Sequence, residues 1–232
     1  MTAPDTLEPD GFDRYLTSLL GSWRALAVPH EDARTWQSDA FVAARFPRHP
    51  VLNNAALLSG SAWPGVAGLY DRGEPYAIWA ADEPADRVLE AAGLRRAATT
   101  TPMLADLRTV AAADRDAQVL ADVDPAVVAD LNGVDHGMLA GVPGLRAFAT
   151  ADGESGLVLV EVDSDVNVSF VQTRPEARGR GLASRVLRAA LATARDRGST
   201  TATLQATPMA VGLYQRAGFR SLGRWHEWEP DA

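Results

Sequence analysis

The 232-residue chain has 47% hydrophobic and 22% charged residues and a formal net charge of −8, which is the composition of a soluble globular protein with one large or two small domains. The acidic balance disfavours nucleic acid and anionic membranes as partners, no apolar run is long enough to span a bilayer, and the acidic N-terminus is no secretory signal, so we expect a cytoplasmic protein. Cysteine is absent and all 22 basic residues are arginine, which excludes disulfides, thiolate nucleophiles and lysine Schiff bases.

The first hundred residues predict a small α/β domain. Apolar residues recur at helical spacing from Phe12 to Trp23, and we expect helices up to about Phe46. Beyond residue 51, glycine and proline punctuate shorter elements. The clearest of these are a strand at 76–80, a helix at 83–92 that ends at Gly93, and a strand at 97–107.

Small and charged residues at 109–117 predict a linker, which divides the chain into domains at 1–110 and 113–232. After it we expect a helix at 125–131 capped by Asp124, a hairpin of strands at 145–150 and 156–162, a strand at 166–173, a helix that ends at Arg197, a strand at 200–206, a short helix at 211–217, and a last strand or hairpin at 219–228. The strand–helix–strand order within 166–206 predicts parallel neighbours with a right-handed crossover.

The strand at 166–173 changes phase along its length. Val166, Val168 and Phe170 alternate, whereas Val171 and Thr173 continue one position out of step. A slip of one residue within a strand indicates a β-bulge, which would bend this strand away from its neighbour and open a cleft in the sheet.

Arginines crowd the start of the helix that follows. They are Arg174, Arg178, Arg180 and Arg185. Because a helix N-terminus is already about half a charge positive, each cation there is unfavourable by ~0.3–1 kcal/mol. Glycines in the same run let the backbone approach a ligand closely. The combination predicts a bound anion, with phosphate the natural candidate.

Two motifs in this region resemble the GNAT superfamily of N-acetyltransferases. The run Arg178-Gly-Arg-Gly-Leu-Ala183 is similar to the family's pyrophosphate loop, Arg/Gln-x-x-Gly-x-Gly/Ala. About thirty residues on, the run from Ala210 to Phe219 is similar to the second signature, Ala-x-x-Leu-Tyr-x-x-x-Gly-Phe. The resemblance covers residues 113–229 and implies a GNAT-like, mixed, twisted sheet with a β-bulge and flanking helices, preceded by a smaller α/β N-terminal domain.

The resemblance also implies acetyl-CoA as co-substrate, no metal, and direct attack of an amine on the acetyl carbonyl. Arg178 and the loop amides would bind the pyrophosphate, the strand segment after the bulge would bind the pantetheine arm, and Tyr214 would be the catalytic acid that protonates the leaving thiolate. The implied coenzyme residues are Val171, Gln172, Thr173, Arg178, Gly179, Arg180, Gly181, Leu182, Ala183 and Thr207. Thr207 stands where many members have asparagine, and its hydroxyl can still form a hydrogen bond.

Other interpretations stay open. The arginines could form a solvated surface or an RGRG contact with nucleic acid, and Tyr214 could be structural, which would leave a silent acyl-CoA sensor. A dinucleotide loop is disfavoured, because the third glycine of Gly-x-Gly-x-x-Gly is replaced by Ser184. The acceptor would be a small-molecule or peptide amine. Candidates for its general base are Glu161, Asp163, His136 and Glu227, and water is the alternative.

The N-terminal domain faintly resembles the second half of a GNAT unit, because its strand, helix and extended segment follow in the same order. It lacks the Arg-x-x-Gly-x-Gly loop between residues 1 and 108. We therefore expect a degenerate repeat without coenzyme binding, which covers the substrate side of the site or forms a homodimer.

Overall fold

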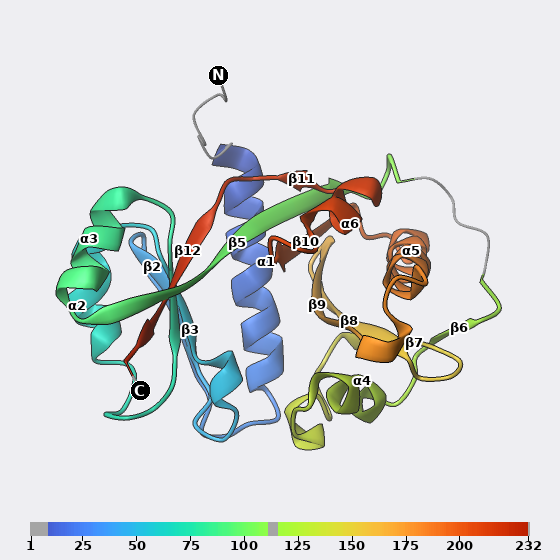
Figure 1. Ribbon diagram of the computed structural model, residues 1–232, viewed down its shortest axis with the longest axis horizontal. Coiled ribbons are helices and arrows are strands. Elements are labelled where there is room, and N and C mark those ends of the chain that lie inside the picture. Colours follow the sequence, from blue (N-terminus) through green and yellow to red (C-terminus); the bar gives the residue numbers. More distant parts are fainter. Residues whose placement is uncertain (1–8, 111–115, 232) are drawn as a thin grey trace.

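One twisted sheet organises both halves of the chain in the computed structural model, which describes residues 9–110 and 116–231 (Figure 1). The helices are α1 (Pro9–Ala27), α2 (Trp63–Ala67), α3 (Glu83–Ala91), α4 (Pro125–Asn132), α5 (Leu182–Asp196) and α6 (Val211–Arg216). The strands are β1 (Arg34–Gln37), β2 (Phe41–Arg45), β3 (Asn54–Leu57), β4 (Ala77–Ala80), β5 (Leu94–Asp106), β6 (Val119–Ala121), β7 (Leu145–Thr150), β8 (Ser155–Val162), β9 (Asp165–Thr173), β10 (Thr201–Ala206), β11 (Arg220–Ser221) and β12 (Trp225–Pro230).

The strand order shows two similar units placed back to back. It runs β1-β2-β3-β4-β12-β5-β10-β9-β8-β7-β6, with β11 beside β5. Two pairs of described strands are parallel, β3 with β4 and β9 with β10. Helix α2 connects the first pair and α5 the second. Each pair is followed by a further helix, α3 or α6, and then by strand, which is β5 in the first half and β11 and β12 in the second. The N-terminal half thus repeats the element order of the C-terminal half, and the fold is the predicted mixed α/β sheet.

The two units exchange their last strands. Strand β5, from the N-terminal half, pairs antiparallel with β10 from Asp106 to Thr101, while β12, from the C-terminal end, pairs with β4. Asp86 on α3 holds β12 there, because one carboxylate oxygen accepts from Trp228 Nε1 (2.8 Å) and the other contacts His226 Nδ1. The sheet is therefore continuous between elements that lie on either side of the predicted linker, whose residues 111–115 fall outside the described part of the chain.

Helices cover both faces of this sheet. Helix α1 lies across the middle of the molecule, where it contacts β1 and β2 on one side and β8, β9 and β10 on the other (Figure 1). Gly21 permits this crossing, because a Cβ atom there would lie 2.3 Å from Val162 Cγ1. Helix α4 shares the hydrophobic cluster of α1, whereas α5 and α6 form a second cluster and α2 and α3 a third.

Most predicted elements are confirmed, and one is wrong. Residues 34–45 were expected to be helical but form the hairpin β1–β2, in which Trp36 pairs with Ala43. The middle of β2 is buried on both faces, so its apolar residues form a continuous run. Such a run has no strand period and cannot be told from a buried helix by spacing.

Asp165, at the start of β9, is a buried carboxyl that should reduce stability at neutral pH. Burial raises its pKa, and hydrogen bonds, among them one from Thr203 Oγ1 to Oδ2 (3.2 Å), offset only part of that rise. Oδ1 has no hydrogen-bond partner among the described residues. Because the folded pKa lies above the unfolded one, the favourable contribution is present in acid and is lost as the pH rises through the folded value.

We therefore expect Asp165→Asn to be more stable than wild type near pH 8 and the difference to shrink near pH 4, since the amide is isosteric and stays neutral. Urea unfolding at the two pH values measures this difference. Asp163→Asn removes an exposed charge two residues away and serves as the control. A gain of stability that is the same at both pH values would contradict the ionisation of Asp165 as its cause.

Candidate active site

The site begins where β9 and β10 separate. The two strands pair only through Asp165–Asn167 and Thr201–Thr203. Beyond this point β10 continues along β5 to Ala206, and β9 continues along β8 to Thr173. A gap therefore opens in the sheet between the carboxyl ends of two parallel strands, the place where α/β sheets bind ligands.

A β-bulge at Phe170 and Val171 turns β9 away, as the phase slip predicted. Gly156 lies opposite Gln172 and Val158 opposite Ser169, so β9 carries one residue more than β8 in this interval. Phe170 adopts a left-handed conformation with φ 55°, which is strained for a bulky residue. Asn132 at the end of α4 stabilises the turn, because its Nδ2 donates to the Phe170 carbonyl (3.0 Å).

On the α5 side of the gap lies a cavity of about 470 Å³, called the loop cavity below. Of the residues expected to bind coenzyme or to act in catalysis, it is lined by Val171, Gln172, Thr173, Arg178, Gly179, Gly181, Leu182, Ala183, Thr207 and Tyr214. The fold thus brings together two motifs that are about thirty residues apart. Arg180 is not among the lining residues.

The glycine loop of this cavity presents backbone to a ligand. Gly179 and Gly181 have φ of 78° and 76°, and a Cβ atom at either would meet no other atom within 4 Å. Helix α5 begins after Gly181 without a side-chain cap. The N–H groups of its first turn therefore remain available to donate to an anion, which the helix dipole would also favour.

The arginines around this loop differ in their partners. Arg180 pairs with Glu154 (2.6 Å), and Arg185 pairs through two nitrogens with Asp116 (2.6 and 2.7 Å). Arg178 lines the cavity, and its Nε donates to the Thr173 carbonyl (3.4 Å). Acids distant in sequence thus offset part of the positive charge that the local sequence places at the helix start.

Tyr214 reaches the loop cavity from α6. Its ring packs edge-on against Phe219 with centroids 5.9 Å apart, and 6% of the residue is exposed. Burial raises the pKa of Tyr214 to about 12. The phenol therefore stays protonated at neutral pH and is a proton donor rather than a base.

A second cavity of about 270 Å³ opens on the α1 side of the same two strands and is called the α1 cavity. Strand β9 lines it with residues 167–170, up to the first residue of the bulge. Gln205 of β10 also lines it, two positions before Thr207 of the loop cavity. The N-terminal half supplies the rest of the wall, namely Tyr15, Leu19, Ser22, Trp23, Leu26, Leu52, Asn54, Trp79 and Thr100.

Sequence reasoning missed this wall, although it expected the N-terminal half to cover the substrate side. The only local signal is that polar Tyr15, Ser22 and Trp23 share the apolar face of α1.

None of the four candidate bases is among the described residues that line the two cavities. Glu161 pairs with Arg197 (2.9 Å), Asp163 lies in the β8–β9 turn, and His136 pairs with Asp130 (2.6 Å), whose hydrogen bond raises the His136 pKa. Glu227 lies behind the α1 cavity, where its Oε2 accepts from Trp79 Nε1 (3.1 Å).

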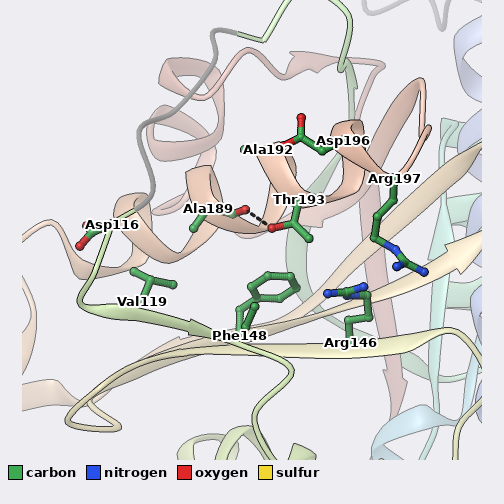
Figure 2. Close-up of a pocket in the computed structure, with 10 residues that line it drawn as sticks. Asp116, Val119, Arg146, Phe148, Ala189, Ala192, Thr193, Asp196 and Arg197 are labelled. Atoms are coloured by element: carbon green, nitrogen blue, oxygen red, sulfur yellow. Dashed lines mark hydrogen bonds between the residues drawn. The ribbon is translucent and has the colours of Figure 1, made fainter.

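A third cavity, of about 420 Å³, lies between α5 and the strands β6 and β7 (Figure 2). Figure 2 shows Arg197 extending from the end of α5 and Arg146 from β7, with the Arg146 guanidinium turned toward the Phe148 ring, 5.9 Å from its centroid. Each has an acidic partner outside the cavity, Asp122 for Arg146 (2.7 Å) and Glu161 for Arg197 (2.9 Å). This cavity shares no lining residue with the loop cavity and holds none of the predicted site residues.

No cluster of three or more His, Asp or Glu side chains in the described part of the chain is arranged to hold a metal ion. None of the described helices is both long and apolar enough to cross a membrane.

Comparison with known proteins identifies the family of a domain in the C-terminal half. Residues 147–227 match the family model of the acetyltransferase (GNAT) domain. They form a GNAT acetyltransferase domain. No curated protein matches the sequence.

The likeness to solved GNAT structures extends over the whole chain. A GCN5-related N-acetyltransferase from Kribbella flavida is 16% identical, with a TM-score of 0.62 over 91% of this chain and 96% of that one. A GNAT-family protein from Novosphingobium aromaticivorans is 20% identical, with a TM-score of 0.62 over 94% and 99%. A tandem GNAT protein from the clavulanic acid biosynthesis pathway is 12% identical, with a TM-score of 0.55 over 97% and 96%. At these identities the likeness shows the fold.

The bulge of the GNAT domain should depend on Asn132. We expect Asn132→Ala to lower the free energy of unfolding by about 1 kcal/mol, because the Phe170 carbonyl loses a donor at a partly buried bulge. Asn132→Asp keeps the shape but not the donor and should cost at least as much. Urea unfolding of both variants measures this, and an aspartate variant as stable as wild type would exclude the donor role.

Proposed function

We propose that the protein transfers an acetyl group from acetyl-CoA, bound in the loop cavity, to an amine bound in the α1 cavity. The observation that carries the proposal is that both cavities are lined by β9 and its neighbours beside the gap between β9 and β10, with the consecutive residues Phe170 and Val171 facing one cavity each. A thioester held along residues 171–173 would have its acetyl group near the bulge, and the amine would approach from the other side of the sheet. The GNAT domain supports acetyl transfer in general.

The chemistry is direct attack. The amine nitrogen forms a bond to the acetyl carbon, and the carbon–sulfur bond of the thioester breaks. Tyr214 would give its phenolic proton to the departing thiolate, and the amine loses its extra proton to water. Loop amides and Arg178 would bind the pyrophosphate. The chain has no cysteine, which agrees with a reaction that forms no thioester on the enzyme.

The N-terminal half would position the acceptor, because it supplies most of the α1 cavity. A domain boundary near residue 110, a cytoplasmic location, a homodimer and the lack of nucleic-acid or membrane partners stay predictions. A catalytically silent acyl-CoA sensor is the alternative, and a turnover assay separates it from the enzyme.

Acetyl-CoA should raise the melting temperature of the protein, because a ligand that binds only the native state stabilises it. We expect Gly181→Asp to abolish this shift, since its Cβ and carboxylate would occupy the space of the pyrophosphate and repel it. Thermal unfolding with and without acetyl-CoA makes the measurement.

Gly73→Asp is the matched control, because Gly73 also has a positive φ, 85°, and open space at its Cβ. Both variants carry the same backbone strain, roughly 1–2 kcal/mol, and the same added charge. A full acetyl-CoA shift in folded Gly181→Asp would show that the loop is not the coenzyme site.

Tyr214→Phe should lower kcat by about tenfold or more, because it removes the proton donor and keeps the ring. The coenzyme Kd should change by less than about threefold, since the hydroxyl is not needed for packing. Steady-state kinetics and calorimetry provide the two values. The raised pKa places any loss of activity from Tyr214 ionisation near pH 12. An unchanged kcat would return Tyr214 to a structural role.

A further inference from the structure

The α1 cavity is lined by uncharged side chains alone among its described residues. Aromatic groups dominate its apolar wall, and they are Tyr15, Trp23, Trp79 and Phe170. Its polar groups are the hydroxyls and amides of Ser22, Asn54, Thr100, Asn167, Ser169 and Gln205. A protein with a net charge of −8 thus leaves this cavity without the carboxylates that a cationic substrate would require.

Several of these polar groups are already held in one orientation. Tyr15 donates its hydroxyl to Gln205 Oε1 (2.7 Å), and Gln205 Nε2 donates to Thr100 Oγ1 (2.7 Å). Ser169 donates its hydroxyl to Asn167 Oδ1 (2.5 Å). Burial raises the pKa of Tyr15, so its phenol stays protonated at neutral pH and cannot act as a base. The wall therefore recognises a ligand through fixed dipoles and aromatic surface and offers no base.

Glu227 is the carboxyl group directly behind this wall. Trp79 stands between it and the cavity, with the indole N–H directed at the carboxylate. Burial raises the pKa of Glu227. Glu227 accepts the hydrogen bond from Trp79 and thereby fixes the orientation of the indole that lines the cavity.

An ammonium ion is poorly stabilised in such a place. The aromatic rings offer an ammonium ion a cation–π attraction of about 2 kcal/mol, which is smaller than the cost of taking an unpaired cation out of water. A strongly basic amine, which is protonated in water at neutral pH, would therefore have to lose its proton before it enters the cavity. A weakly basic amine is already neutral in water and enters in the form that can attack the thioester.

We infer that the acceptor is a weakly basic aromatic amine, whose nitrogen is neutral near pH 7 and whose ring packs against Trp79 and its aromatic neighbours. The inference rests on the proposed acetyl transfer. The volume of about 270 Å³ suits a single small ring system rather than a long polyamine. The neutral nitrogen forms the new bond to carbon, sulfur leaves with the proton of Tyr214, and the surplus N–H proton passes to water.

The test compares three amines with acetyl-CoA near pH 7, followed by thiol release. They are 4-methylaniline, 4-methylbenzylamine, which keeps the ring but is strongly basic, and 1,4-diaminobutane. We expect kcat/KM for 4-methylaniline to exceed that for the benzylamine by roughly tenfold and that for the diamine by roughly a hundredfold. Its rate should also stay flat between about pH 6 and about pH 8.5, while the benzylamine rate rises with pH.

The outcomes separate the inference from the proposed function. Preference for the diamine, with turnover lost in Gly181→Asp, would overturn the inference and leave acetyl transfer in place. In calorimetry, failure of 4-methylaniline to bind the protein saturated with coenzyme A, which carries no acetyl group to transfer, would also overturn it. If acetyl-CoA itself produces no thermal shift, the proposed function fails, and the inference fails with it.

Asn167→Asp provides a test by substitution. It adds a carboxylate to the cavity and keeps the acceptor for Ser169. We expect kcat/KM for 4-methylaniline to fall roughly tenfold and that for the diamine to rise. Gln37→Glu on β1 adds the same charge outside the cavity, keeps the contact with Arg24 (3.0 Å), and should change neither value. Equal effects of the two variants would contradict the inference.

Glu227→Gln tests whether Glu227, the candidate base that lies behind the α1 cavity, takes part in the reaction. Glutamine still accepts from the Trp79 indole, so activity with 4-methylaniline should change by less than about twofold. A fall of roughly tenfold, with loss of the low-pH limb of the rate profile, would make Glu227 the base for a cationic amine and overturn the inference.

Discussion

The separation of β9 from β10 is the feature on which the proposed site depends. Two parallel strands that pair for three residue positions and then part leave backbone donors and acceptors without sheet partners. The protein stabilises this arrangement from both sides, because β10 gains β5 as a partner and β9 keeps β8. The bulge at Phe170, held by Asn132, sets the direction in which β9 leaves.

Strand exchange explains why the two halves form one site. Strand β5 completes the edge of β10, and β12 returns to β4, where Asp86, Trp79 and Glu227 fix it through side-chain contacts. A chain that began at residue 113 would lack β5 and expose the edge of β10, an unpaired edge that favours aggregation. The two motifs that line the loop cavity belong to one half, and most of the wall of the α1 cavity belongs to the other.

The two cavities have opposite electrostatic character. The loop cavity combines Arg178 with helix N–H groups, a set of donors suited to phosphate oxygens. The described residues that line the α1 cavity supply neutral dipoles and aromatic rings and include no Asp, Glu or His. Such a division fits a reaction between an anionic coenzyme and an uncharged nucleophile. Burial raises the pKa of Tyr214 to about 12, so in the proposed reaction its phenol would act as a proton donor.

Features that depend on neighbouring residues were predictable from the sequence. The Asp124 cap, the phase slip in β9, the glycines before α5 and the motif around Tyr214 each express a local backbone or side-chain requirement, and the elements follow from them. Tertiary contacts decided the rest. The apolar run of β2 became a strand because β1 and β3 pair with it, and the acids that offset Arg180 and Arg185 come from distant segments. The α1 cavity exists only where α1, β3, β4 and β5 meet the bulged strand, since burial of those side chains arises from packing between residues far apart in the chain.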